Sequence, residues 1–207
     1  MVGYEIQVMV STAARICTVD EYLQQESVAI GKHEYLNGEV VEMPGGTANH
    51  SLIALYFALY LKQALIAANS STVKLFNSDM RLWLPESNSF TYPDGMVVKG
   101  EPAYRDGNQT AITNPCLIVE VLSDRTAAYD RGEKFQNYSA IAEFEEYLLF
   151  DQTQYRVEQF CRQVDNKKFK DEWVYRAIAG KDAEIQLSSL GVSVAIADIY
   201  EDVYFDA

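Results

Sequence analysis

The pattern of apolar and polar positions predicts a sheet with helices packed on it. Residues 33–43 predict a β-hairpin, because Asn37 and Gly38 form a two-residue turn between two short strand-like runs. A long helix that ends near Ala68 follows, with Thr47 or Asn49 as its N-cap. Its apolar residues lie nearly all the way round, which predicts that it packs against a sheet on one side and another layer on the other.

Shorter segments complete this picture. Thr18 and Glu21 form a capping box that predicts a short helix through Gln25, and residues 127–141 predict a further helix. Strands are expected at 73–76, 80–84, 96–98 and 117–122, and strands or turns at 147–151, 155–162, 172–179 and 192–199. The fold class is therefore α/β or α+β, around one mixed central sheet flanked by helices. Residues 1–17 lack periodicity and are expected to be an N-terminal extension to a single domain at 18–207.

Composition narrows the class of protein. The three cysteines are far apart and form no CxxC pair, so neither a disulfide framework nor a zinc site is indicated. A reducing cytoplasm is the expected compartment. The most apolar run, residues 52–68, contains a lysine and is short for a bilayer span of about 20 residues, so no membrane partner is expected. The net charge of −13 argues against a tight, non-specific nucleic-acid binder.

Two acids and a lysine are the candidates for chemistry. Asp94 follows a proline and precedes a β-branched run, and Glu120 lies inside the apolar run 117–122. A buried carboxylate is costly unless it is paired or holds a metal. Lys134 lies on the next predicted helix, which can fold back across the Glu120 strand. Three simpler interpretations stay open: a turn aspartate, a glutamate in a salt bridge, and an exposed Asp130–Lys134 pair at i, i+4.

The order of these motifs resembles the Uma2 family, also called DUF820, of the PD-(D/E)XK nuclease superfamily. The resemblance covers roughly residues 18–200, and it rests on segments 35–43, 49–51, 92–98, 116–123, 129–135 and 146–151. It implies a restriction-endonuclease-like core and an endonuclease that uses Mg²⁺, or Mn²⁺, to hydrolyse phosphodiester bonds. It also implies a nucleic-acid partner, with DNA as the first expectation, and a homodimer.

Roles for single residues follow from this resemblance. Asp94, Glu120 and the main-chain carbonyl of Val121 would hold the metal, which keeps several waters. The superfamily usually places its lysine two residues after the glutamate, where this chain has Leu122, so Lys134 is the candidate for a lysine that has moved to the helix.

Two further residues are weaker candidates. Glu39 matches an acid of the family and is expected near the metal, or else on the solvent face of the hairpin. His50 begins the long helix, where it would contact phosphate or simply belong to the capping region.

Two other classes of function remain open. One is a catalytically inactive module that keeps the nuclease fold and binds nucleic acid or assembles with partners; the displaced lysine and the acidic charge favour it. The other is a structural homodimer whose buried acids only form salt bridges. Two carboxylates that share a site repel each other, so a metal site predicts a raised pKa for at least one of them.

Overall fold

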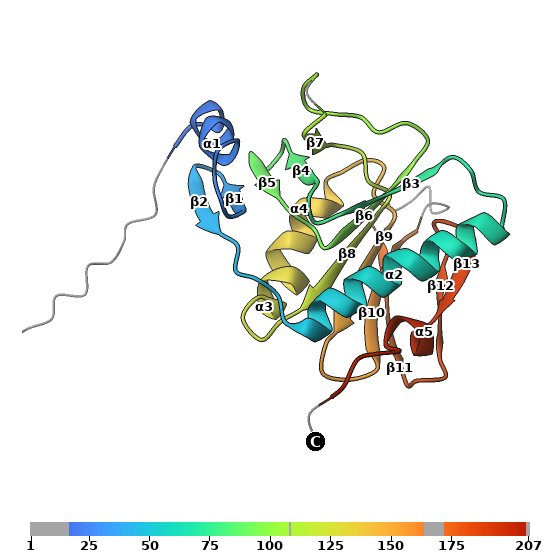
Figure 1. Ribbon diagram of the computed structural model, residues 1–207. Helices are drawn as coiled ribbons and strands as arrows, with labels where there is room; N and C mark the ends of the chain where they lie inside the picture. Colours follow the sequence, from blue (N-terminus) through green and yellow to red (C-terminus); the bar gives the residue numbers. More distant parts are fainter. Residues whose placement is uncertain (1–16, 108, 164–171, 206–207) are drawn as a thin grey trace, which may run out of the picture.

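A six-stranded mixed sheet forms the centre of the protein (Figure 1). A computed structural model describes residues 17–107, 109–163 and 172–205. The strand order is β11-β10-β9-β8-β6-β3. The strands span β3 Val73–Asn77, β6 Gly95–Lys99, β8 Leu117–Leu122, β9 Glu146–Asp151, β10 Arg156–Arg162 and β11 Trp173–Ala179. β8 and β9 are parallel and the other neighbours are antiparallel, so the predicted mixed central sheet is confirmed.

β8 carries an apolar core on each of its faces. All six of its residues are buried, as expected for a nearly continuous apolar strand covered on both sides. Leu117, Val119 and Val121 pack into the core under helix α2, whereas Ile118 and Leu122 pack into the core on the opposite face. Because side chains alternate along a strand, Glu120 faces the same side as Ile118 and Leu122.

The long helix α2, Ala48–Ala67, crosses one face of the central sheet (Figure 1). Thr47 is its N-cap and accepts a hydrogen bond from the backbone N–H of His50. Four residues at intervals of four are buried against β8, β3, β13 and α5: Ile53, Phe57, Leu61 and Leu65. Among the described residues α2 is the one helix whose length and hydropathy would allow a membrane span, and its buried stripe packs into the protein core.

Smaller elements surround this centre. A five-stranded sheet has the order β2-β1-β5-β4-β7, and β12 pairs with β13 in a hairpin beside α2. The strands are β1 His33–Leu36, β2 Glu39–Glu42, β4 Arg81–Leu84, β5 Ser89–Thr91, β7 Ala111–Ile112, β12 Glu184–Leu187 and β13 Val192–Ala195. The short helices α1, Val19–Glu26, and α5, Ile196–Ile199, lie near the two ends of the described chain (Figure 1). The capping box of Thr18 and Glu21 is present, and Asn37 and Gly38 both take positive φ angles of 47° and 104° in the predicted hairpin turn.

Two fold expectations need correction. The described residues form three sheets, whereas one was expected. Strands β5, β7 and β12 were not predicted, and β5 and β7 have only three and two residues, too few to show a periodicity. The helix expected at 127–141 is not a regular α-helix. It consists of α3 Ala127–Tyr129, a π-helical segment η1 Asp130–Lys134 and α4 Phe135–Ser139. The predicted extension at residues 1–17 lies outside the described residues except for Cys17.

The packing of α2 gives a matched test of this core. Leu61 is fully buried, and Leu59, on the same helix, is 45% exposed. Leu61→Ala should lower the free energy of unfolding by about 2–5 kcal/mol, because it leaves a cavity between α2 and the sheet. Leu59→Ala should change it by about 0.5 kcal/mol or less. Urea denaturation measures both values, and equal losses would contradict the packing described here.

Candidate active site

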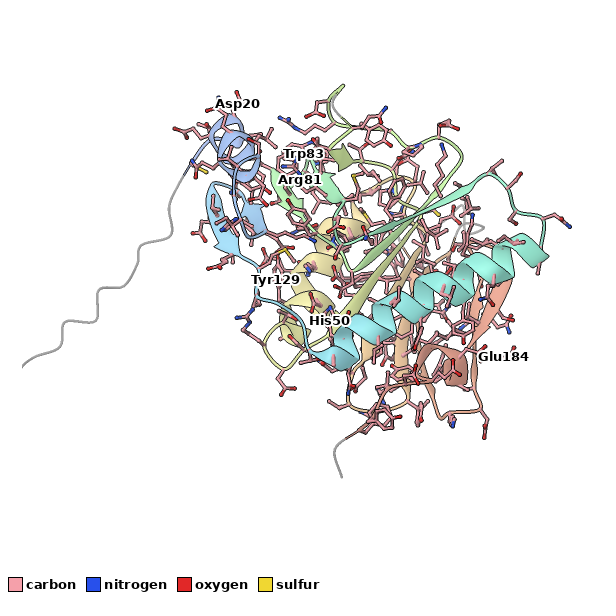
Figure 2. The ribbon with its side chains drawn as sticks, in the orientation of Figure 1. Asp20, His50, Arg81, Trp83, Tyr129 and Glu184 are labelled. Carbon is pink, nitrogen blue, oxygen red and sulfur yellow. The ribbon has the colours of Figure 1, made fainter. Side chains whose placement is uncertain are left out.

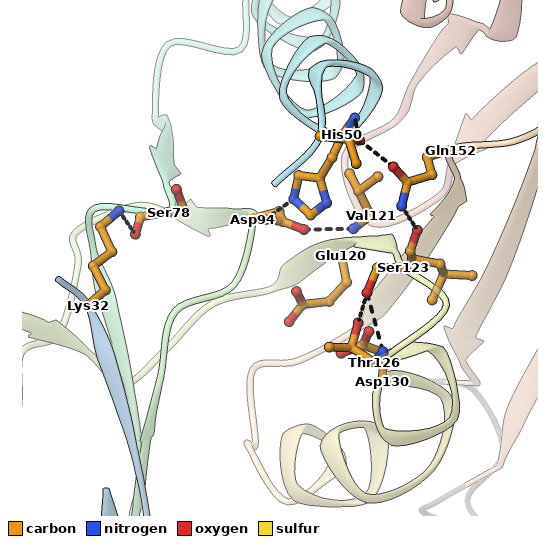
Figure 3. A network of polar contacts seen from close by, with 12 residues as sticks. Lys32, His50, Ser78, Asp94, Glu120, Val121, Ser123, Thr126, Asp130 and Gln152 are labelled. Carbon is orange, nitrogen blue, oxygen red and sulfur yellow. Dashed lines mark hydrogen bonds and ion pairs between the residues drawn. The ribbon is translucent and has the colours of Figure 1, made fainter. Parts of the chain in front are cut away.

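Asp94 and Glu120 come from neighbouring strands of the central sheet. Asp94 directly precedes β6, whose first residue Gly95 pairs with Val119 in β8, so Asp94 lies beside the Glu120 position. The backbone N–H of Val121 donates a 2.7 Å hydrogen bond to Oδ2 of Asp94 (Figure 3). This bond holds the aspartate across the end of β8, at the point where β8 contributes its acid.

His50 reaches the same point from α2. Its Nε2 lies 2.8 Å from Oδ1 of Asp94, and its place in the first turn of α2 is visible in Figure 2. Burial alone would lower the pKa of the imidazole. The hydrogen bond and the charge of Asp94 outweigh burial, and the pKa of His50 is raised above its ordinary value. Both oxygens of Asp94 are therefore hydrogen-bonded, one to the imidazole of His50 and one to the backbone N–H of Val121.

Glu120 is 4% exposed. Its side chain lies on the face of β8 that points away from α2, where two donors hold it. Its Oε1 accepts hydrogen bonds from Lys134 Nζ at 3.0 Å and from the Tyr138 hydroxyl at 2.9 Å. Burial raises the pKa of Glu120 to about 8, and the negative charges of Asp94 and Asp130 add to this effect against the attraction of Lys134. The raised pKa expected for one acid of a shared site is thus found at Glu120.

Lys134 lies among three carboxylates. Its Nζ is 3.0 Å from Glu120, 3.2 Å from Asp130 and 3.8 Å from Glu34. The side chain is buried, which excludes the exposed Asp130–Lys134 pair as an explanation for the spacing. Burial would lower the pKa of the ammonium group, but the surrounding carboxylates raise it well above its ordinary value. The π-helical segment η1 contributes both Asp130 and Lys134, and π-helical turns are frequent at functional sites.

The hairpin contributes an acid that the sequence analysis missed. Glu34 on β1 is 7% exposed, and it accepts a 3.3 Å hydrogen bond from the backbone N–H of Tyr92 as well as facing Lys134. Its signal in the sequence was an acid inside the first strand of a hairpin with an apolar neighbour, Tyr35. Glu39, the predicted acid, is exposed on β2 at the edge of its sheet and does not line the cleft described next. Since directly paired residues share a face, Glu39 lies on the same face as Glu34, but beside the turn and one strand further out.

A cleft of about 720 Å³ opens over these groups. His50, Asp94, Glu120 and Lys134 all line it, and so do Ser123, Arg125, Thr126, Asp130 and Gln152. Gln152 connects its walls: Nε2 donates a 2.7 Å hydrogen bond to the Leu122 carbonyl, and Oε1 accepts one from the Thr47 hydroxyl (Figure 3). The N-terminus of α2, which carries His50, is thereby tied to the end of β8.

Comparison with known proteins identifies the family of this chain. The family model Uma2, described as "Putative restriction endonuclease", matches residues 19–197. The chain belongs to the Uma2 family.

Two relatives from Synechocystis sp. and one solved structure are similar to this chain over most of their length. The chain is 39% identical to "Uncharacterized protein sll1609" of Synechocystis sp. over 184 residues, 89% of this chain and 99% of the relative. It is 33% identical to "Uncharacterized protein slr1290" of the same organism, over 90% of this chain and 92% of that one. A crystal structure described as that of "a putative nuclease belonging to DUF820" from Anabaena variabilis superposes with a TM-score of 0.67 at 16% identity, covering 91% of this chain and 99% of that chain. The fold of this Uma2 protein is therefore restriction-endonuclease-like, as predicted.

The site of this Uma2 protein is suited to a hard cation such as Mg²⁺. Within the described residues no three His, Cys, Asp or Glu side chains form a complete metal-ligand cluster. Mg²⁺ does not need one, because it is usually bound through one or two carboxylates and keeps several waters. Glu120 brings a carboxylate whose Oε2 accepts no hydrogen bond from the described residues, and Asp94 lies across from it in the same cleft. Carboxylate oxygens of this kind are the ligands that a hard divalent cation prefers.

The raised pKa of Glu120 predicts a pH-dependent stability. A carboxyl whose pKa rises from 4.5 to about 8 on folding stabilises the fold below pH 4.5, and this stabilisation is lost as the pH rises through about 8. Glu120→Gln should remove the effect, while Lys134 keeps Asp130 and Glu34 as partners.

Urea denaturation in metal-free buffer at pH 5 and at pH 8.5 measures this pH dependence of the free energy of unfolding. From pH 5 to pH 8.5 the free energy of unfolding of the Glu120→Gln protein should rise by on the order of 2–4 kcal/mol relative to that of wild type. Glu42→Gln, an exposed change on β2, serves as the control and should show no such gain. A Glu120→Gln protein that is much less stable than wild type at pH 8.5 would instead identify Glu120 as one half of a purely structural ion pair.

Proposed function

We propose that this Uma2 protein is a Mg²⁺-dependent endonuclease that hydrolyses phosphodiester bonds of DNA. The observation that carries the proposal is the meeting of Asp94, Glu120 and Lys134 in one cleft from three separate elements. Family membership supports the same reading, since the family is described as "Putative restriction endonuclease". Two acids and a buried lysine beside an open cleft supply the charges that a phosphodiester-cleaving site needs.

Each residue has a role that its position supports. Asp94, Glu120 and the Val121 carbonyl would hold the ion, which when bound lowers the pKa of a water and offsets phosphate charge. Tyr138 and Lys134 orient Glu120 through its Oε1. Lys134 stays cationic at neutral pH and faces the cleft, so it can orient the attacking water or stabilise the added negative charge of the transition state. His50, at the N-terminus of α2, supports a phosphate contact.

A catalytically inactive module that binds nucleic acid or assembles with partners is the second candidate. The net charge of −13 favours it, and so does the pairing of Lys134 with three carboxylates, which leaves the lysine little net positive charge to offer. A bound divalent cation would supply the missing positive charge, because it reverses the local sign of charge.

Metal-dependent cleavage is the direct test. In Mg²⁺ or Mn²⁺ the wild-type protein should cut DNA. Asp94→Asn and Lys134→Gln should each lower the rate by on the order of 10²–10³-fold, because the first removes a proposed ligand of the ion and the second removes the positive charge that would stabilise the transition state. Asp124→Asn, an exposed change in the loop after β8, should leave the rate unchanged. Gel-based assays with folded variants, checked by circular dichroism, measure this, and wild-type protein that binds DNA without cutting it in either ion would favour the inactive module.

Metal affinity should depend on pH. Because the pKa of Glu120 is raised to about 8, this acid is mostly protonated at pH 7 and must release its proton to bind a cation. The Kd for Mn²⁺ should therefore fall about tenfold per pH unit between pH 6 and pH 8 and level off above it. Calorimetric titration in two buffers of different ionisation enthalpy measures both the affinity and the released proton. Binding that is independent of pH would rule out Glu120 as a ligand.

The homodimer and the cytoplasmic location also remain proposals. Leu55, Leu59 and Ile66 are exposed on one face of α2, an apolar surface that supports contact with a second copy. Sedimentation velocity of the full chain would establish the oligomeric state.

A further inference from the structure

The cleft continues beyond the acids along α2. His50, Ala54 and Ala58 all line it, and their spacing of four places them on one face of the helix. At 1.5 Å per residue, Ala54 lies about 6 Å and Ala58 about 12 Å along the helix axis from His50. Ala54 and Ala58 are the small side chains of this wall, next to the residue that contacts Asp94, and Leu55 and Phe57 of α2 line the cleft with larger apolar side chains.

The facing wall is apolar and begins where Asp94 ends. Gly95, which follows Asp94, pairs with Asn77, and two residues further along Val97 pairs with Leu75. Leu75 and Val97 both pack toward the core under α2, and both line the cleft. The whole cleft, about 720 Å³, has the size of a site for an organic ligand, which exceeds the needs of one ion and one phosphate.

Cationic side chains are few in this cleft and mostly paired. Lys32, Arg125 and Lys134 line it, against Asp94, Glu120 and Asp130. Lys32 lies 2.6 Å from Asp79, and Lys134 is paired with three carboxylates. Among the described residues Arg125 is the cation of the cleft that forms no ion pair. A protein that binds duplex DNA through the sugar-phosphate backbone neutralises many phosphates with lysine and arginine side chains. This cleft has few such side chains to offer.

We infer that the cleft binds an unpaired nucleotide, with its base between α2 and β3 and its phosphate at Asp94 and Glu120. The substrate would then be a single strand, or a strand opened locally at the cut, rather than a closed duplex. Burial of a base against apolar side chains supplies binding energy that does not depend on positive charge, which suits an acidic protein. The inference rests on the proposed function and names its substrate class.

Binding to wild-type protein in Ca²⁺, an ion chosen to allow binding while chemistry is slow, tests the inference. Fluorescence anisotropy would compare a random-sequence DNA single strand, the matching duplex, and an RNA single strand of the same sequence. The single strand should bind at least about tenfold more tightly than the duplex, in line with the contribution of one buried base. The RNA strand shows whether the sugar matters for this same pocket.

Filling the pocket should remove this preference. Ala58→Leu and Ala54→Leu should each weaken single-strand binding by about tenfold, because a leucine occupies the space of the base, and should leave duplex binding unchanged. Ala67→Leu, the same change at an exposed position in the last turn of α2, should change neither. Calorimetric binding of Mn²⁺ by each variant confirms that the fold and the acids are intact.

The outcomes distinguish a failure of the nucleotide pocket from a failure of the proposed endonuclease. Duplex binding as tight as single-strand binding, no measurable binding of either, or tight single-strand binding that survives both leucine variants would overturn the unpaired-nucleotide pocket. Wild-type protein that binds no Mn²⁺ would overturn the proposed endonuclease instead. Cleavage restricted to duplex DNA would leave the endonuclease standing and reject the pocket.

Discussion

The burial of Lys134 among carboxylates is the interaction on which the site depends. Its ammonium group joins β8 through Glu120, η1 through Asp130 and the hairpin through Glu34. A buried lysine alone would be strongly destabilising, and so would any of the three acids alone. Together they offset one another, and the hydroxyl of Tyr138 adds a neutral donor to Glu120. The cluster is therefore stable only when the two sheets and the interrupted helix are assembled in their observed positions.

This cluster carries more negative than positive charge, and that excess is useful to a metal site. Desolvation and the charges of Asp94 and Asp130 keep the pKa of Glu120 near 8, despite Lys134. A structural ion pair would be better served by one acid for one base. An excess of carboxylate beside an open cleft leaves room for a cation, and the cation would supply the positive charge that an acidic protein otherwise lacks.

A second set of contacts fixes where the cleft begins. Thr47 caps α2, Gln152 ties that cap to the end of β8, and His50 closes onto Asp94 from the same turn. Three of these hydrogen bonds, Thr47–Gln152, Gln152–Leu122 and His50–Asp94, join segments that are far apart in the chain. Beyond them the wall of α2 changes from His50 to apolar residues, Ala54, Leu55, Phe57 and Ala58, so the cleft changes from polar to apolar within about two helical turns.

Local patterns in the sequence predicted those features that short-range physics determines. The capping box at Thr18, the turn at Asn37 and Gly38, and the fully buried strand β8 each depend on residues within a few positions, and each is confirmed. Asp94 and Glu120 could be selected because an acid beside or inside an apolar strand is unusual at any position. The resemblance to Uma2 then supplied Lys134 as the candidate lysine.

Only the tertiary structure decided which acids share the site. Glu34 and Glu39 both lie on one hairpin, with side chains on the same face, and the docking of that hairpin against the central sheet brings one of them to Lys134 and leaves the other exposed. The π-helical turn of η1 and the two-residue strand β7 also have no periodic signature in so few residues. A sequence determines which side chains share a face of one element, because alternation is local; which face meets which depends on packing between elements distant in the chain.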